Sequence, residues 1–241
     1  MRKLRKALWL LGKGHHWPLL KRFRRWLWHD EVALGLEYDP RVPVTARLPT
    51  MSLEVRPIRD DEIRVFTSLP PSGSGRVEAL TRTNARDLLE SGLKTCYVGV
   101  TADGPIYMQF LITAEENDRV AEVFGPLFPP LAEDEGLLEF AYTLQQHRAR
   151  PVMPTVLLRL IEIAGEQGVR RLTTYVHVAN AGFLRFFLRL GFQPHTVRVE
   201  KSRLLRRQVE FLPIDHELLE RFGERADVNA LTNSLLRPAV R

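Results

Sequence analysis

Hydrophobic and polar residues follow patterns along this chain that change period several times. Runs with period two predict strands at 53–59, 95–101, 106–113, 137–144, 171–178, 196–203 and 208–214. Runs with helical spacing predict helices at 76–93, 153–166, 182–190 and 216–225, and a short helix that begins at Asp60. Strands interleaved with helices in this order predict a mixed α/β sheet flanked by helices.

The pattern also divides the chain into segments. Residues 1–38 contain every tryptophan, interleaved with basic residues at helical spacing, and predict an amphipathic arm. Residues 39–52 are rich in proline and predict an extended linker. One domain is expected at 53–214, followed by a C-terminal helix and tail at 215–241. Within the domain, 66–80 and 119–136 are expected to supply loops around a substrate.

Charge is concentrated in the arm. Residues 1–30 carry a net charge of +8, against +6 for the whole chain, so the domain itself is slightly acidic. This argues against a nucleic-acid-binding domain, whose body would be basic. The apolar faces of residues 1–30 are expected to dock on the domain or on a second copy of the chain. Peripheral contact with a membrane is one alternative for this arm, and contact with nucleic acid is another.

Cysteine content and hydropathy exclude further classes of protein. The single Cys96 excludes an intramolecular disulfide and a metal site built on cysteines, so no metal is expected. No apolar run approaches the ~20 residues that span a bilayer. The expected location is the cytoplasm, with attachment to a membrane surface as the alternative.

The turn after Leu144 reads QQHRARPVMPT and leads from a strand into a helix. Free backbone N–H groups and the helix dipole at such a corner bind a pyrophosphate well. Arg148 and Arg150 would add charge-assisted hydrogen bonds, and the N–H groups of Val152 and Met153 would complete the site. An ordinary strand–helix corner with solvated arginines is the alternative.

Glu139 is a lone acid in the apolar strand LLEFAYTL. An unpaired buried carboxylate has a raised pKa, which suits a general base. A structural salt bridge or a sheet edge is the alternative, and His177 on the next strand is a second candidate base. Strand alternation is expected to place Glu139, Ala141 and Thr143 on one face and Leu138, Phe140, Tyr142 and Leu144 on the other.

The order of elements from Arg148 to Phe192 resembles the acyl-CoA-binding half of the GNAT N-acetyltransferases. That family has Arg/Gln-x-x-Gly-x-Gly/Ala at the pyrophosphate turn. Here Arg148 matches, but Pro151 and Met153 replace the two glycines. Asn180 and the Gly191-Phe192 pair reproduce the family's spacing at the next helix. Phe187 stands where the family usually has a tyrosine that protonates the leaving thiolate.

The resemblance implies the GNAT fold over residues 53–214 and transfer of an acyl group, most often acetyl, from acetyl-CoA to a primary amine. Glu139 would be the base, and Tyr142 or Tyr175 would replace the missing phenol. The N–H of Thr143 or Leu144 would contact the thioester. The expected acyl-CoA contacts are Thr143, Leu144, Arg148, Arg150, Val152, Met153, Asn180 and Phe187. Two alternatives remain: an inactive binding or scaffold protein on this fold, and a membrane-surface acyltransferase for a lipid or cell-envelope precursor.

Overall fold

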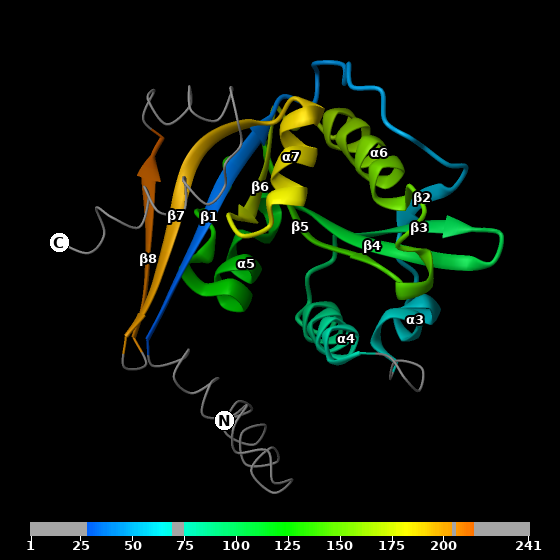
Figure 1. Cartoon of the computed structure of the whole chain (residues 1–241), viewed down its shortest axis with the longest axis horizontal. Coiled ribbons are helices and arrows are strands. Elements are labelled where there is room, and N and C mark those ends of the chain that lie inside the picture. Colours follow the sequence, from blue (N-terminus) through cyan, green and yellow to red (C-terminus); the bar gives the residue numbers. More distant parts are fainter. Residues whose placement is uncertain (1–27, 69–74, 204–205, 215–241) are drawn as a thin grey trace, which may run out of the picture.

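The computed structural model describes residues 28–68, 75–203 and 206–214. They fold around one sheet of eight strands with helices on both faces (Figure 1). The mixed α/β architecture predicted from the sequence is confirmed. Residues 1–27 of the predicted arm and the helix predicted at 216–225 lie outside the described part of the chain.

The strand order is β2-β3-β4-β5-β6-β1-β7-β8, and only β5 and β6 run parallel. The strands are β1 Trp28–Tyr38, β2 Glu54–Pro57, β3 Cys96–Thr101, β4 Gly104–Thr113, β5 Glu135–Thr143, β6 Arg171–His177, β7 Gln193–Arg203 and β8 Arg206–Pro213. The helices are α3 Ile63–Thr67, α4 Arg76–Leu89, α5 Asn117–Phe124, α6 Val152–Glu166 and α7 Ala181–Leu190. Short 3-10 turns lie at Asp60–Glu62, Ala114–Glu116, Gly125–Leu127 and Gln145–His147.

The helices form two layers. Helices α6 and α7 cover one face of the sheet, and α3, α4 and α5 cover the other (Figure 1). Each layer has its own apolar core: Val156 and Leu184 belong to the first, and Phe66 and Val120 to the second. Part of the segment expected as a loop at 119–136 is therefore helical, because α5 uses Val120 to close the second core.

Helix α6 illustrates how the apolar pattern becomes packing. Its buried residues recur every three to four positions and form one stripe. Val156 on this stripe lies against β3, where a Cβ on Gly99 would come within 2.7 Å of its Cγ2 atom. Glycine at that position allows close approach of helix and strand. The helix ends before Gly168, whose φ of +83° supplies the left-handed turn predicted there.

Strand β1 corrects the predicted domain boundary. Residues 28–38 were expected to belong to the arm, but they form a central strand between β6 and β7. Leu34 and Leu36 are fully buried, and Val32 and Tyr38 lie in the same core. The segment VALGLEY has the alternation of a strand. The neighbouring tryptophans and arginines have helical spacing, and the prediction extended their helical arm over this segment. The domain therefore includes residues 28–38.

Strands β5 and β6 separate after a short parallel contact. Pairing runs only from Glu135–Arg171 to Leu137–Thr173. Beyond these residues β5 continues beside β4, while β6 continues beside β1, and the two ribbons diverge (Figure 1). The facing edges of β5 after Leu137 and of β6 after Thr173 consequently have no strand partner among the described residues.

A bulge interrupts β5 at its open edge. Met108 pairs with Tyr142 and Phe110 with Glu139, so two residues of β5 lie opposite a single residue of β4. Phe140 within the bulge has φ of +54°, a strained conformation for a residue other than glycine.

The bulge contradicts the predicted alternation of side chains. Leu138 packs in the core below α6 and α7, whereas Tyr142 and Leu144 pack in the core on the α3–α5 side. The extra residue shifts the strand's period by one, so every side chain beyond it changes face. Glu139 and Tyr142 therefore lie on the same face of the sheet, not on opposite faces as expected.

Candidate functional site

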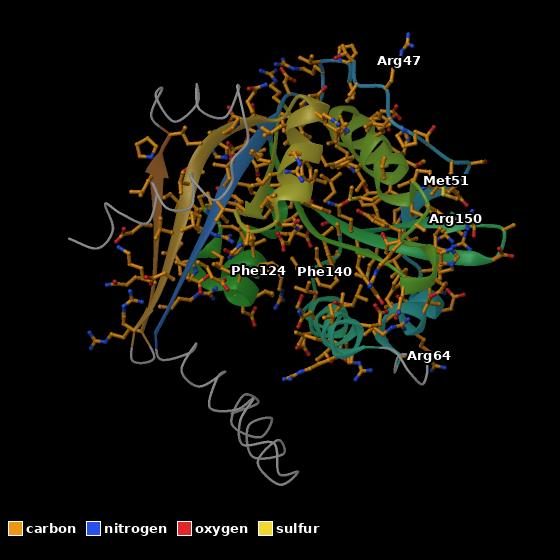
Figure 2. All side chains as sticks on the ribbon, in the orientation of Figure 1. Arg47, Met51, Arg64, Phe124, Phe140 and Arg150 are labelled. Carbon is orange, nitrogen blue, oxygen red and sulfur yellow. The ribbon has the colours of Figure 1, made fainter. Side chains whose placement is uncertain are left out.

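Glu139 lies half-buried on β5, where this strand has left β6 and enters the bulge. Desolvation raises the pKa of its carboxyl to about 7, while the charge of Arg198 and the N–H of Phe140 act in the opposite direction. A carboxyl with this pKa changes protonation state near neutral pH, as a general base must. Figure 2 shows the neighbouring Phe140 and, on α5, Phe124, which belong to the same apolar cluster.

Arg198 reaches this cluster from β7. Its guanidinium carbon lies 5.2 Å from the centre of the Phe128 ring and 5.1 Å from that of Tyr175. Its Nη1 donates to the carbonyl of Leu127 at 2.9 Å. Desolvation lowers the pKa of Arg198, and among the charges that oppose this effect Glu139 acts most strongly. Arg198 forms no ion pair within the described residues, so a positive and a negative group share this region without neutralising each other by contact.

Tyr142 has a different partner. Its hydroxyl donates to Glu78 of α4, and Arg82 and Arg148 donate to the same carboxylate. Although desolvation acts to raise it, the pKa of Glu78 is lowered overall by the hydrogen bonds from Tyr142 and Arg82 and by Arg148. Burial and the bond to Glu78 raise the pKa of Tyr142. A catalytic role of Tyr142 stays a prediction.

The two backbone groups predicted to contact a thioester differ in availability. Leu144 donates its N–H to the carbonyl of Ile106 at 3.0 Å, so the prediction for the Leu144 N–H is wrong. Successive residues of an antiparallel strand point their backbone groups to alternate sides, which directs those of Thr143 away from β4. The carbonyl of Thr143 indeed accepts from Arg148 Nε at 3.2 Å. Only the Thr143 N–H therefore remains a candidate.

The predicted pyrophosphate turn retains few free donors. The N–H of Val152 donates to the carbonyl of Arg150 at 2.8 Å, so its predicted role in anion binding is contradicted. The N–H of Thr155 donates to Pro151 at 3.4 Å. Met153 has no backbone acceptor among the described residues. The tight bend at Pro151, with φ of −78° and ψ of +45°, turns the Val152 N–H back into the chain.

The two arginines of this turn are also unequal. Arg148 donates to Glu78 and Thr143, which ties it to the interior. Arg150 is exposed, and its Nη1 lies 3.3 Å from Nδ1 of His147. Figure 2 shows Arg150 beside Met51 near the start of α6, consistent with the hydrogen bond from the Met51 N–H to Thr155 Oγ1. Arg150 is therefore the better placed of the two to bind an anion.

Asn180 and Phe187 shape helix α7. The side chain of Asn180 accepts from the Phe183 N–H at 3.3 Å and caps the helix. The Phe187 ring is 2% exposed and packs against Phe192 with ring centroids 4.9 Å apart. These contacts give both residues a structural role, and their contact with acyl-CoA stays a prediction. The other candidate base, His177, is exposed and accepts from the Ala179 N–H.

Sequence reasoning missed Arg198 and Glu78. Arg198 lies between Val197 and Val199, and this alternation of apolar and polar residues predicts a strand but no functional side chain. Glu78 looks like an ordinary first-turn acid of a helix. Nothing in the sequence shows that the charge of Arg198 acts on Glu139 or that α4 contacts Tyr142, because both depend on how distant elements assemble in the fold.

The described residues show no grouping of three or more His, Cys, Asp and Glu side chains suited to a metal ion. No described helix has the length and apolar character needed to cross a membrane. These findings add no further ligand to the site around Glu139.

Comparison with known proteins identifies a family. The model of the acetyltransferase (GNAT) family matches residues 85–192, from within α4 to just beyond α7. A search of curated proteins finds no match.

Solved structures with similar folds include a Drosophila protein at 15% identity and a TM-score of 0.46, covering 79% of this chain and 59% of its own. A GNAT-family acetyltransferase from Colwellia psychrerythraea has 14% identity, a TM-score of 0.46 and coverage of 76% and 56%. A GCN5-related N-acetyltransferase from Sphaerobacter thermophilus has 12% identity, a TM-score of 0.44 and coverage of 77% and 57%. The present chain thus spans less than two thirds of each of these proteins.

The family match covers the separating strands, the turn before α6 and the capped helix α7. On this sequence match, residues 85–192 belong to the GNAT acetyltransferase family, and the mixed sheet that they help to build is consistent with the GNAT fold.

Proposed function

We propose that the protein transfers an acyl group, first of all acetyl, from acyl-CoA to a primary amine. The observation that carries this proposal is Glu139, a half-buried carboxyl whose pKa is raised to about 7 by desolvation at the bulge of β5. Family membership supports acetyl transfer as the reaction class.

The chemistry needs two proton movements. The ionised carboxylate of Glu139 takes one proton from the substrate ammonium, and the nitrogen lone pair then forms a bond to the thioester carbon. Collapse of the adduct breaks the carbon–sulfur bond and yields an amide and a thiolate. The nitrogen loses its second proton, and the thiolate gains one to become CoA thiol. Overall, the ammonium ion and acetyl-CoA give the amide, CoA thiol and one proton.

Several groups of the chain fit acyl-CoA as the donor substrate. The open edge of β5 offers the N–H of Thr143, which is suited to the carbonyl oxygen of the thioester. The Met153 N–H and the exposed Arg150 are suited to the pyrophosphate. Asn180 lies at the facing edge, at the start of α7. Tyr142 is proposed to return a proton to the thiolate, with Tyr175 as the alternative.

Transfer assays with acetyl-CoA and a panel of amines test the proposal. Because only the ionised carboxylate accepts a proton, kcat/KM is expected to rise with pH through about 7. Glu139→Gln is expected to lower kcat by about 100-fold or more and to remove this pH limb. Glu162→Gln, an exposed acid of α6, is the control. Full activity in Glu139→Gln would reject Glu139 as the base.

The second candidate is a protein that binds acyl-CoA or a partner without catalysis. The internal hydrogen bond of Val152 and the buried Phe187 favour it, because one removes a phosphate donor and the other lacks a phenol. Acetyl-CoA at about 100 times its Kd should stabilise a binding protein by about 2.7 kcal/mol. Thermal stabilisation without turnover of any amine would support this candidate, and an absence of stabilisation would reject acyl-CoA binding in both.

A further inference from the structure

Arg198 has more hydrogen-bonding capacity than its surroundings use. A guanidinium carries five N–H donors, and the described residues supply one acceptor, the carbonyl of Leu127. Its guanidinium carbon lies 5.2 Å and 5.1 Å from the ring centres of Phe128 and Tyr175, and these rings supply no conventional hydrogen-bond acceptor for the N–H groups. A desolvated positive charge is costly unless an anion or further acceptors meet it. Within the part of the chain that the structure describes, the remaining N–H groups of the guanidinium therefore have no protein acceptor.

Glu139 lies on the same face of the sheet as the Arg198 guanidinium, and its carboxylate has the opposite charge. Its carboxyl is half-buried and forms no ion pair within the described residues. Tyr175 lies on β6, between β5 and β1 in the strand order, and the guanidinium carbon of Arg198 lies 5.1 Å from the centre of its ring. The two groups influence each other's charge without forming a contact ion pair. They thus present one negative and one positive group beside one cluster of aromatic side chains, hereafter the aromatic wall, which includes Phe128, Phe140 and Tyr175.

Other aromatic rings extend this wall. Phe124 packs edge-on against Phe128 with ring centroids 5.0 Å apart, and Phe211 of β8 lies 5.9 Å from Tyr175. Such rings offer apolar surface to the carbon skeleton of a small molecule. The surface therefore combines a proton acceptor, an apolar wall and an anion-binding group.

We infer that the acceptor is an amine that also carries a carboxylate, such as an amino acid, and that Arg198 binds the carboxylate while Glu139 faces the amine. This inference rests on the proposed function. A planar guanidinium edge matches a carboxylate in a bidentate geometry. The opposite charges of the two protein groups match the opposite charges of a zwitterion. Arg198 is thus a specificity-determining residue, and the proton acceptor remains Glu139.

Matched acceptors test the assignment. Phenylalanine, phenylalaninamide and phenethylamine share a skeleton and an amine, and only the first carries a carboxylate. The wild-type kcat/KM is expected to be roughly 10- to 100-fold higher for phenylalanine than for the other two. The same comparison with 4-aminobutyrate and butylamine covers acceptors in which the two groups are further apart. The inference requires that the wild-type kcat/KM be higher for the carboxylate-bearing amine in at least one of these two sets.

Variants of Arg198 locate the origin of that preference. Arg198→Gln is expected to abolish it by raising KM for the acid roughly 10- to 100-fold, with KM for the amines that lack a carboxylate changed less than about 3-fold. Arg198→Lys keeps the charge but loses the planar fork, so part of the preference should remain. Arg207→Gln, which removes an exposed arginine paired with Glu200 on the neighbouring strand, is the control and should behave as wild type. Equal thermal stabilisation of all forms by acetyl-CoA shows that the donor site is intact.

The outcomes separate this inference from the proposed function. Equal kcat/KM in the wild type for amines with and without a carboxylate overturns the carboxylate site but leaves acetyl transfer standing. A uniform loss for all acceptors in Arg198→Gln also overturns it, because Arg198 would then only support the fold. If no amine is acetylated, the proposed function fails, and binding decides the inference. Thermal stabilisation by the amino acid that is lost in Arg198→Gln supports the site, and no stabilisation overturns it.

Discussion

At the scale of single residues, Glu139 combines a chemical advantage with a cost to stability. Its folded-state pKa of about 7 lies above the ordinary value of 4.5 because burial disfavours the charge. Between these pH values the folded protein binds more protons than the unfolded chain, so the free energy of unfolding falls as pH rises. The group that is suited to accept a proton at neutral pH therefore weakens the fold at that pH.

This linkage predicts the behaviour of Glu139→Gln in thermal unfolding. The uncharged amide removes the cost of burying a carboxylate, so the variant should gain in melting temperature over the wild type as pH rises from 5 to 8. Differential scanning calorimetry at the two pH values measures the difference. Glu162→Gln, at an exposed ion pair, should show no such trend. A constant difference between variant and wild type at both pH values contradicts the raised pKa.

Glu78 shows the opposite balance, because its buried charge is paired. The carboxylate is 2% exposed and accepts from Tyr142, Arg82 and Arg148. Glu78→Gln leaves the buried Arg82 without its anion and should lower the free energy of unfolding by about 3 kcal/mol. Glu122→Gln, at the exposed pair with Arg119, should change it by less than about 1 kcal/mol.

Urea unfolding of the two variants measures both values. Similar losses in Glu78→Gln and Glu122→Gln would show that the Glu78 cluster is not a buried network.

The sequence identifies some site residues and not others for physical reasons. Glu139 could be found because an acid is unusual in an apolar strand. Asn180 and Gly191 could be found because cap residues are local signals, and the side chain of Asn180 and the left-handed φ of Gly191 form these caps. Arg198 could not be found, because the residues that it contacts come from distant parts of the chain. The use of the Leu144 N–H by Ile106 depends on hydrogen-bond register, which apolar alternation does not reveal.

At the scale of elements, the strands and helices from β2 to α7 follow from hydrophobic period, whereas the bulge and β1 do not. The bulge adds one residue opposite Gln109, and no glycine at Phe140 marks it. Strand β1 was missed because its alternation adjoins a segment with helical spacing. Local pattern identifies an element's type, but its neighbours in the sheet depend on contacts between distant parts of the chain.

Gly35 in β1 gives an element-scale prediction. A Cβ at Gly35 would lie 2.4 Å from Thr196 Cγ2 and 3.0 Å from atoms of Tyr175 and His195. Gly35→Ala should therefore disturb the packing of β1 between its neighbours and lower the free energy of unfolding by about 1–3 kcal/mol. Gly182→Ala in α7 is the matched control, since a Cβ there meets nothing within 4 Å.

The control should be neutral or raise the free energy of unfolding by up to about 1 kcal/mol, because alanine favours a helix over glycine. Urea unfolding compares the two variants. Unchanged stability in Gly35→Ala would mean that β1 packs more loosely than described.

At the scale of the whole molecule, the sheet is continuous only because β1 joins β6 to β7. A chain that begins at residue 39 lacks this strand and exposes the facing edges of both neighbours. It should fail to unfold cooperatively, whereas a chain that begins at residue 28 should retain a cooperative transition. Circular dichroism during heating distinguishes them. Cooperative unfolding of the shorter chain would contradict an integral role for β1.

Strand β1 also affects the timing of folding on the ribosome. It pairs with β7, which is translated ~160 residues later. At about 5–20 residues per second, roughly 10–30 s pass between synthesis of the two strands. During this interval the nascent segment VALGLEY is not yet paired with β7. Unpaired apolar strands are prone to aggregate. We predict that the positive charge of the preceding basic residues reduces aggregation of the unpaired strand until translation reaches β7.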